Sequence, residues 1–160
     1  MVNRGNLHGM PGVIAALLLT AGLAVLPGCE KGEPLITIDS PAAWLSPMIV
    51  GSGSVFMKID NRGSGDDVLL SANVELPGAI TELHDVRDGK MAKTDSIKVP
   101  AGSVTELRPG SLHIMIFNMP KTIASGYTAT VLLHFEKTGT RNVAITFQNN
   151  TDSSRKSHAH

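Results

Sequence analysis

Turn signals recur about every dozen residues along most of this chain and divide it into short apolar segments. Asp88-Gly89, Pro100-Ala101-Gly102 and Pro109-Gly110 are three such turns, because glycine and proline favour the backbone angles that turns need. Between turns, apolar residues mostly alternate with polar ones, which is the period of a half-buried strand. Many short strands with regularly spaced turns favour an antiparallel sandwich or a Greek-key barrel, so we expect an all-β domain. Eight or nine strands are predicted, over residues 36–38, 55–59, 68–72, 79–86, 96–99, 104–107, 112–117, 127–135 and 142–147.

The composition argues against several classes of protein. The 160 residues carry a formal net charge of zero, so no basic surface for nucleic acid is indicated. Aromatic residues make up 4 % of the chain, which is too few for a base-stacking platform. The sequence contains no Gly-x-Ser-x-Gly elbow and no phosphate-binding glycine loop. We therefore expect neither a nucleic-acid-binding protein nor a hydrolase.

The first 29 residues have the pattern of an export signal. Arg4 gives a positive start, and the apolar run from Val13 to Leu26 has 14 residues, too few to span a bilayer comfortably. The run ends in Leu26-Pro27-Gly28-Cys29, which resembles a bacterial lipobox, and Cys29 is the only cysteine in the chain. We expect a signal peptide over residues 1–29, lipidation of Cys29 and a place in the cell envelope, on the periplasmic or extracellular side. The alternative is a plain secretory signal with an incidental cysteine.

The remaining chain divides into three parts. Residues 30–34 are a short polar tether, and residues 35–149 form the folded domain. Residues 150–160 form a polar tail that we expect to be flexible. The tail ends in His158-Ala159-His160, which either binds Cu(II) weakly or is only solvated chain.

Four side chains in the domain are candidate ligands for a soft metal ion. His113 and Met115 stand two apart in a predicted strand, so they project to the same face. His84 and Met91 flank the Asp88-Gly89 turn, so a hairpin would bring them close together. Imidazole and thioether are soft donors, which select Cu(I) over harder divalent ions. Two histidines and two methionines are enough to hold one Cu(I) ion.

Other candidate residues have simpler interpretations. Met115 itself, between two isoleucines, is equally well explained as a core residue. Met57 alternates with apolar neighbours and is expected in the core. His134 lies on an apolar strand and is expected to be a hydrogen-bonded structural residue. Asp66 and Asp67 lie in a turn and are expected to be solvated.

The donor pattern resembles the PCuAC family of periplasmic Cu(I) chaperones, which is described by the motif His…Met-x21-His-x-Met. Here the motif is His84, Met91, His113 and Met115, with the 21-residue gap kept at positions 92 to 112. Six residues separate His84 from Met91, fewer than is usual in the family. The similarity covers about residues 35 to 148 and includes the segments 56–61, 65–69, 82–84, 99–102 and 106–110.

The resemblance implies a cupredoxin-like Greek-key sandwich or barrel and a copper carrier rather than an enzyme. It implies Cu(I) as the cargo, held by His84, Met91, His113 and Met115. It also implies a copper-donating or copper-accepting partner, such as a cytochrome oxidase copper-site subunit or an assembly factor. The alternative from another class is a lipid-anchored β-sandwich that acts in adhesion or as an accessory subunit, without metal and with the methionines in its core.

Overall fold

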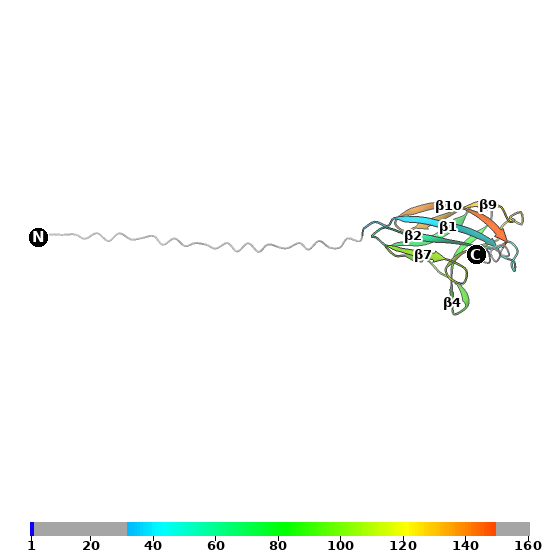
Figure 1. Ribbon diagram of the computed structural model, residues 1–160, viewed down its shortest axis with the longest axis horizontal. Coiled ribbons are helices and arrows are strands. Elements are labelled where there is room, and N and C mark those ends of the chain that lie inside the picture. Colours follow the sequence, from blue (N-terminus) through cyan, green and yellow to red (C-terminus); the bar gives the residue numbers. More distant parts are fainter. Residues whose placement is uncertain (2–31, 150–160) are drawn as a thin grey trace, which may run out of the picture.

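Ten β-strands make up the part of the chain that the computed structural model describes, residue 1 and residues 32–149 (Figure 1). In chain order they are β1 (Ile36–Leu45), β2 (Gly53–Asn61), β3 (Asp67–Val74), β4 (Ile80–Arg87), β5 (Lys90–Lys93), β6 (Ile97–Val99), β7 (Ser103–Leu107), β8 (His113–Phe117), β9 (Thr128–Phe135) and β10 (Gly139–Asn149). No helix occurs within these residues, and so none of them forms a helix that could cross a membrane. The prediction of an all-β domain is confirmed.

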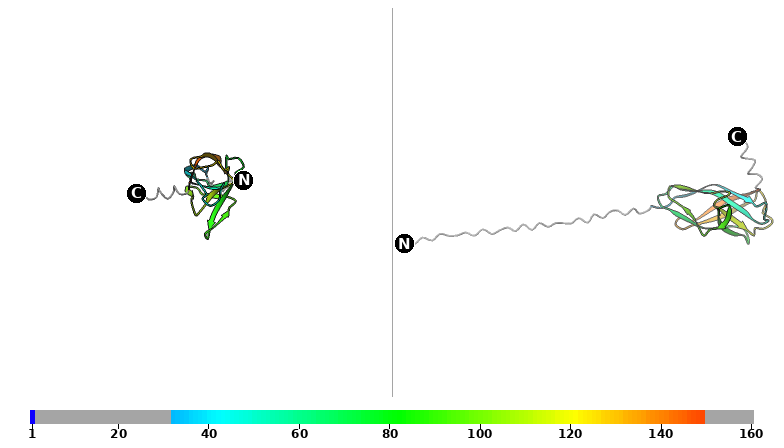
Figure 2. Two further views of the ribbon diagram at one scale, coloured as in Figure 1. Left: turned by 90° about the vertical axis from the view of Figure 1, so that its right-hand side faces the viewer. Right: turned by 90° about the horizontal axis from the view of Figure 1, so that it is seen from below.

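The strands form two layers that enclose one core (Figure 2). One layer has the order β5-β4-β8-β2-β1, and the other has the order β10-β9-β3-β6. In the first layer, β8 pairs with the beginning of β2 and β7 pairs with the rest of the same edge of β2. β1 and β10 pair in parallel and join the layers, whereas every other pair among the described strands is antiparallel. The core between the layers includes the fully buried side chains of Ile59, Leu69, Ile114, Leu133 and Phe147. Met57 lies in this core, as its alternation with Val55 and Ile59 predicted.

The hairpin of β4 and β5 extends away from the body of the domain (Figures 1 and 2). Its turn consists of Asp88 and Gly89, with φ angles of 52° and 72°, between the paired residues Arg87 and Lys90. Two central residues with positive φ define a type I′ turn, which the Asp-Gly sequence favours. All four residues of β5 are exposed. The predicted hairpin is therefore present and places Met91 on a projecting element.

Strand β1 continues well past the predicted segment 36–38 and ends at Leu45. Its pairing with β2 shifts register between Asp39 and Ala42, where Ser40 has a φ of 51° and Pro41 follows. Such a bulge interrupts the alternation of apolar and polar residues. The sequence pattern therefore stopped at the bulge, although the strand continues beyond it. The extension brings Trp44 opposite Ser54 of β2, on the side of the sheet where the candidate site lies.

The prediction that Asp67 is solvated was wrong. Its side chain is 1 % exposed and accepts hydrogen bonds from the backbone N–H groups of Val68, Lys137 and Thr138 and from the Thr138 hydroxyl. Burial raises the pKa of Asp67, but these hydrogen bonds outweigh burial and leave the pKa below its ordinary value. The carboxylate thus fastens the β9–β10 turn to the start of β3.

The ends of the expected domain are partly visible. Pro34, placed in the tether by the sequence, is buried, and the Gly65 N–H donates a hydrogen bond to the Glu33 carbonyl. This end of the tether therefore packs against the turn before β3. Residues 2–31, with the expected signal and Cys29, and the tail over residues 150–160 lie outside the described residues.

Candidate metal site on the outer face of the β4–β8–β2 sheet

The alternation of β8 separates its side chains into two sets. Ile114 and Ile116 are fully buried in the core, so His113 and Met115 face the opposite side of the sheet. On that side they are nevertheless covered, at 3 % and 7 % exposure. Met115 is thus a buried residue outside the main core, and it lines a pocket. The interpretation of Met115 as a residue of the main core is therefore wrong, and its role as a metal ligand stays a prediction.

Strand β4 brings His84 beside His113. The two histidines are directly opposite each other in the β4–β8 ladder, and their ring centroids are 5.7 Å apart. In the same ladder, Glu82 is opposite Met115. Residues opposite each other in an antiparallel pair share a face of the sheet. All four of these side chains therefore lie on the outer face.

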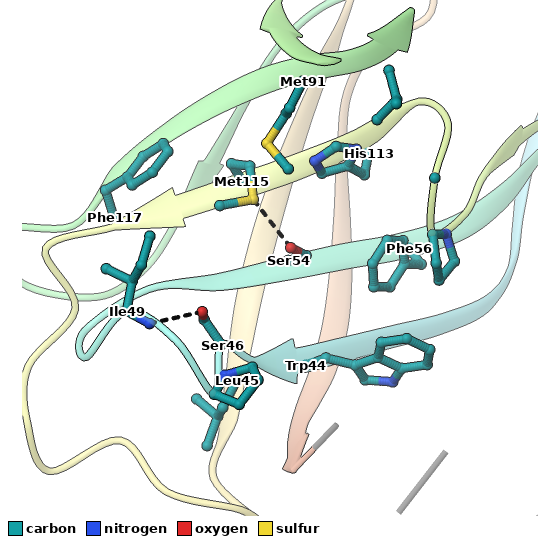
Figure 3. A pocket seen from close by; sticks show the side chains of 14 residues that line it. Trp44, Leu45, Ser46, Ile49, Ser54, Phe56, Met91, His113, Met115 and Phe117 are labelled. Atoms are coloured by element: carbon teal, nitrogen blue, oxygen red, sulfur yellow. Dashed lines mark hydrogen bonds between the residues drawn. The ribbon is translucent and has the colours of Figure 1, made fainter. Parts of the chain in front are cut away.

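Met91 reaches the same face from β5. It pairs with Val86, which lies two residues after His84 and so shares the face of His84. Figure 3 shows Met91, His113 and Met115 pointing toward one another. Unlike the other two, Met91 is 55 % exposed. The structure thus brings three of the four predicted ligands into one pocket and places His84 beside it.

The pocket has a volume of about 440 Å³ and largely apolar walls. Trp44 and Phe56 pack edge to face with their ring centroids 4.9 Å apart, and the ring centroids of Phe56 and His113 are 6.2 Å apart. Phe117 lies 6.0 Å from the His84 ring. Period-two spacing could have indicated Phe117, two residues after Met115, but Trp44 and Phe56 come from other strands and were not predicted at the site. The aromatic rings make the surroundings of the donors apolar.

His113 is held by a hydrogen bond through one ring nitrogen. Its Nδ1 lies 2.7 Å from the Ser111 carbonyl oxygen, and a carbonyl can only accept, so Nδ1 carries the hydrogen. Burial lowers the pKa of His113 and outweighs the hydrogen bond to Ser111, which raises it. A neutral ring is therefore favoured, with a lone pair at Nε2.

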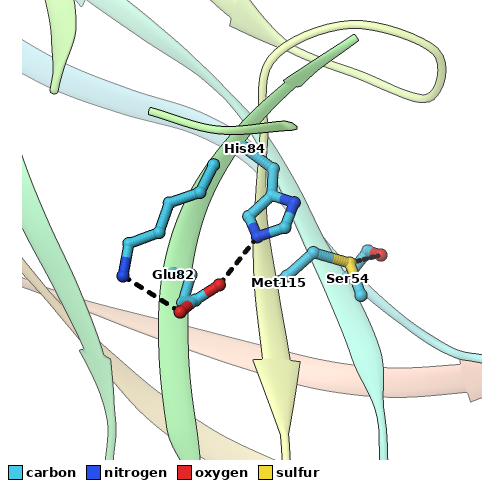
Figure 4. Close-up of polar contacts among 5 residues, drawn as sticks. Ser54, Glu82, His84 and Met115 are labelled. Atoms are coloured by element: carbon cyan, nitrogen blue, oxygen red, sulfur yellow. Dashed lines mark hydrogen bonds and ion pairs between the residues drawn. The ribbon is translucent and has the colours of Figure 1, made fainter. Parts of the chain in front are cut away.

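His84 is held through its other ring nitrogen (Figure 4). Its Nε2 lies 3.0 Å from Oε2 of Glu82, whose other oxygen lies 3.0 Å from Nζ of Lys93. The hydrogen bonds from His84 and Lys93 hold the pKa of Glu82 below its ordinary value. Nδ1 of His84 is buried and has no hydrogen-bond partner among the described residues.

Met115 is also oriented by a neighbour. The Ser54 hydroxyl, opposite it on β2, donates a hydrogen bond of 3.1 Å to the Met115 sulfur. This hydrogen bond orients the thioether. Because sulfur is a weak acceptor, little stability is lost if another partner replaces the hydroxyl at the sulfur.

His134 is not part of the site. It lies on β9 and bonds to Asn73 and Thr140, as expected for a structural histidine. Within residues 32–149, no group of three or more His, Cys, Asp or Glu side chains is placed to hold a metal ion. The donor set on the outer face is instead two imidazoles and two thioethers.

Comparison with known proteins gives a family and a fold. The family model described as "Putative lipoprotein LpqE-like" matches residues 36–147. The "Putative lipoprotein Lxx21020" of Leifsonia xyli subsp. xyli is 28 % identical over 141 residues, which cover 83 % of this chain and 84 % of that protein.

Several solved structures are similar to this chain, and two of them contain copper according to their descriptions. The copper-bound PCuAC domain from PmoF2 matches with a TM-score of 0.59 and 19 % identity, over 73 % of this chain and 98 % of that one. The solution structure of CuI-DR1885 from Deinococcus radiodurans matches with a TM-score of 0.61 and 18 % identity, over 76 % of this chain and 83 % of that one. At these identities the likeness establishes the fold. The predicted cupredoxin-like fold, and the resemblance to PCuAC domains on which it rested, are confirmed.

Proposed function

We propose that this chain, which belongs to the LpqE-like family, carries one Cu(I) ion outside the cytoplasm and passes it to a partner protein. The observation that carries the proposal is the meeting of two thioethers and an imidazole in one apolar pocket, with a second imidazole beside it. The copper-bound PmoF2 domain and CuI-DR1885, which share the fold, support it.

The proposed ligands are His84, Met91, His113 and Met115. Thioethers are neutral and soft, and soft ligands favour Cu(I). The two ring centroids, 5.7 Å apart, leave room for one ion at about 2.0–2.1 Å from a nitrogen of each ring, which is the length of a zinc–imidazole bond. Nδ1 of His84, which has no hydrogen-bond partner among the described residues, fits the same idea, because a metal ion can satisfy a buried lone pair that lacks a hydrogen bond. A blue-copper centre needs a cysteine thiolate, and residues 32–149 contain no cysteine.

The arrangement suits transfer of the ion rather than catalysis. His113 and Met115 are buried in the sheet, whereas Met91 is more than half exposed on the projecting hairpin. A partner protein would therefore meet Met91 first and could replace it before the buried ligands. We propose a partner that gives or takes copper, such as the copper-site subunit of a cytochrome oxidase or one of its assembly factors.

The lipoprotein names of the family and of the Leifsonia relative support an exported protein held at a membrane. Cys29 is the proposed site of lipidation, and it is the residue at which the expected signal peptide ends. Attachment of more than one acyl chain anchors a protein stably, whereas one chain gives only marginal binding. The folded domain would then lie on the outer side of that membrane.

Anaerobic competition titration against a chromophoric Cu(I) chelator tests the proposal. We expect one Cu(I) per chain, with binding strongly weakened by His113→Ala. The matched control is His134→Ala, which removes a histidine of another strand outside the pocket and is expected to leave Cu(I) affinity unchanged. Equal Cu(I) affinity of the two variants would contradict the proposed site, and a wild-type protein that binds no Cu(I) would favour the sandwich without metal.

A further inference from the structure

We propose that Glu82 is a positioning residue that fixes His84 with Nδ1 free, so that His84 binds copper through Nδ1 while His113 binds it through Nε2. This inference rests on the proposed function. It adds which ring nitrogen of each histidine binds copper, and it names Glu82 as the residue that determines this for His84.

The first step is the proton on His84. Glu82 and His84 are two apart on β4 and share a face, and Oε2 of Glu82 lies 3.0 Å from Nε2 of His84. An ionised carboxylate only accepts hydrogen bonds, so Nε2 must carry the hydrogen. A neutral imidazole has one N–H, and Nδ1 is then a bare lone pair.

The second step is the state of that lone pair. Nδ1 is buried and has no hydrogen-bond partner among the described residues (Figure 4 shows it on the side of the ring away from Glu82). Buried polar atoms in native proteins nearly always have a partner, and an unpaired one calls for an explanation such as an ion. A copper ion shared with His113, whose ring lies 5.7 Å away, supplies that partner.

The third step is the support of Glu82 itself. Its other carboxylate oxygen lies 3.0 Å from Nζ of Lys93, which is directly opposite His84 in the β4–β5 ladder. Both carboxylate oxygens are therefore occupied, and the side chain cannot turn without losing an ion pair. Lys93 is two residues after Met91, so the short hairpin carries both a proposed ligand and the group that holds Glu82 in place.

The fourth step is the contrast with His113. There Nδ1 donates to the Ser111 carbonyl, which leaves Nε2 as the free atom. Two histidines that face each other across one ladder are thus held in opposite tautomers by different partners, a carboxylate and a carbonyl. A hydrogen bond to the non-ligating nitrogen fixes the ring and raises the basicity of the ligating one.

Long-range ¹⁵N–¹H correlation NMR of the copper-free, full-length protein tests the tautomers directly. We expect the hydrogen on Nε2 in His84 and on Nδ1 in His113. Glu82→Ala is expected to release the His84 tautomer and to weaken Cu(I) binding about 10–100-fold, the usual effect of losing a group that orients a ligand. Glu82→Gln keeps an oxygen acceptor and is expected to retain the Nε2–H tautomer and most of the affinity.

The matched control is Glu106→Ala, which removes a glutamate on β7 that forms an ion pair with Lys58 on β2. This variant is expected to change neither the His84 tautomer nor the Cu(I) affinity. A wild-type protein that binds Cu(I) but has His84 protonated at Nδ1 would overturn the inference alone. So would a Glu82→Ala variant that binds Cu(I) as tightly as Glu106→Ala. A wild-type protein that binds no Cu(I) would instead overturn the proposed function, and this inference with it.

Discussion

His84 and His113 lie directly opposite each other on β4 and β8, with ring centroids 5.7 Å apart, and each is held by a hydrogen bond through a different ring nitrogen. The strand ladder therefore sets the spacing of the pair, while Glu82 and Ser111 set the orientation of each ring. Met115 follows on β8, and Met91 is supplied by the hairpin that β4 begins. The candidate site is thus built on the paired strands themselves, which hold side chains more firmly than loops do.

Two buried methionines, Met115 at the pocket and Met57 in the core, allow the loss of a ligand to be distinguished from a change in packing. Met115→Leu keeps most of the side-chain volume but removes the sulfur, and we expect Cu(I) affinity to fall by roughly 100-fold or more, beyond the loss of a group that only orients a ligand. Met57→Leu makes the same change in the core, at 2 % exposure, and should leave the affinity unaltered. Competition titration of both variants compares them. Equal affinities would remove Met115 from the site.

Met91 should matter for copper but hardly for folding. Because it is exposed on β5, Met91→Ala is expected to change the free energy of unfolding by no more than about 0.5 kcal/mol. Its Cu(I) affinity should nevertheless fall clearly, as one of four ligands is lost. Met48→Ala, at a still more exposed methionine, serves as the control and should change neither quantity. Urea unfolding and Cu(I) titration measure the two effects, and an unaltered affinity in Met91→Ala would contradict its role.

Asp67 should stabilise the fold in a pH-dependent way. Asp67→Asn replaces an acceptor by an amide whose N–H₂ group faces donors, so we expect the free energy of unfolding at pH 7 to fall by about 1–3 kcal/mol. The pKa of Asp67 is lowered in the folded state, so its stabilising effect is present above the unfolded-state pKa of about 3.9 and is lost as the pH falls through the folded-state pKa. The difference between variant and wild type should therefore be constant from neutral pH down to about pH 5 and shrink below about pH 4.

Urea unfolding at several pH values measures this difference. Asp39→Asn, at an exposed aspartate, is the control and is expected to change stability by less than about 0.5 kcal/mol. A gap between Asp67→Asn and wild type that persists undiminished at low pH would argue against the charge of Asp67 as the cause.

The proposed membrane attachment is expected to depend on a single residue, Cys29. Cys29→Ser is expected to release the protein from the membrane fraction or to leave the precursor uncleaved. Fractionation and mass spectrometry of the wild-type protein and the variant measure this. Recovery of the wild-type protein in soluble form, with a free thiol at Cys29, would show that the lipobox is not used.

Local patterns in the sequence predicted the local features of the fold. Asp88-Gly89 predicted its hairpin because a type I′ turn depends on those two residues alone. Alternation placed Met57 in the core, and the His-x-Met spacing placed His113 and Met115 on one face. Neither pattern could tell which face of β8 points into the core. Ile114 and Ile116 on one face, and His113 and Met115 on the other, are all compatible with burial.

Features that depend on distant residues could not be predicted in this way. Asp67 can be buried as a carboxylate because backbone N–H groups 70 and 71 positions away donate hydrogen bonds to it. The pairing of Glu82 with His84 and Lys93 depends on the register of the short hairpin, and the packing of Trp44 near the pocket depends on a bulge that alternation does not reveal. Such contacts are set by the tertiary fold, and only the structure shows them.

X-ray absorption spectroscopy of the protein loaded with one Cu(I) tests the central claim most directly, because it reports the elements bound to the metal. The account predicts both sulfur and nitrogen scatterers around copper in the wild-type protein, with less sulfur in Met115→Leu. A spectrum with only nitrogen or oxygen scatterers, unchanged by Met115→Leu, would contradict it.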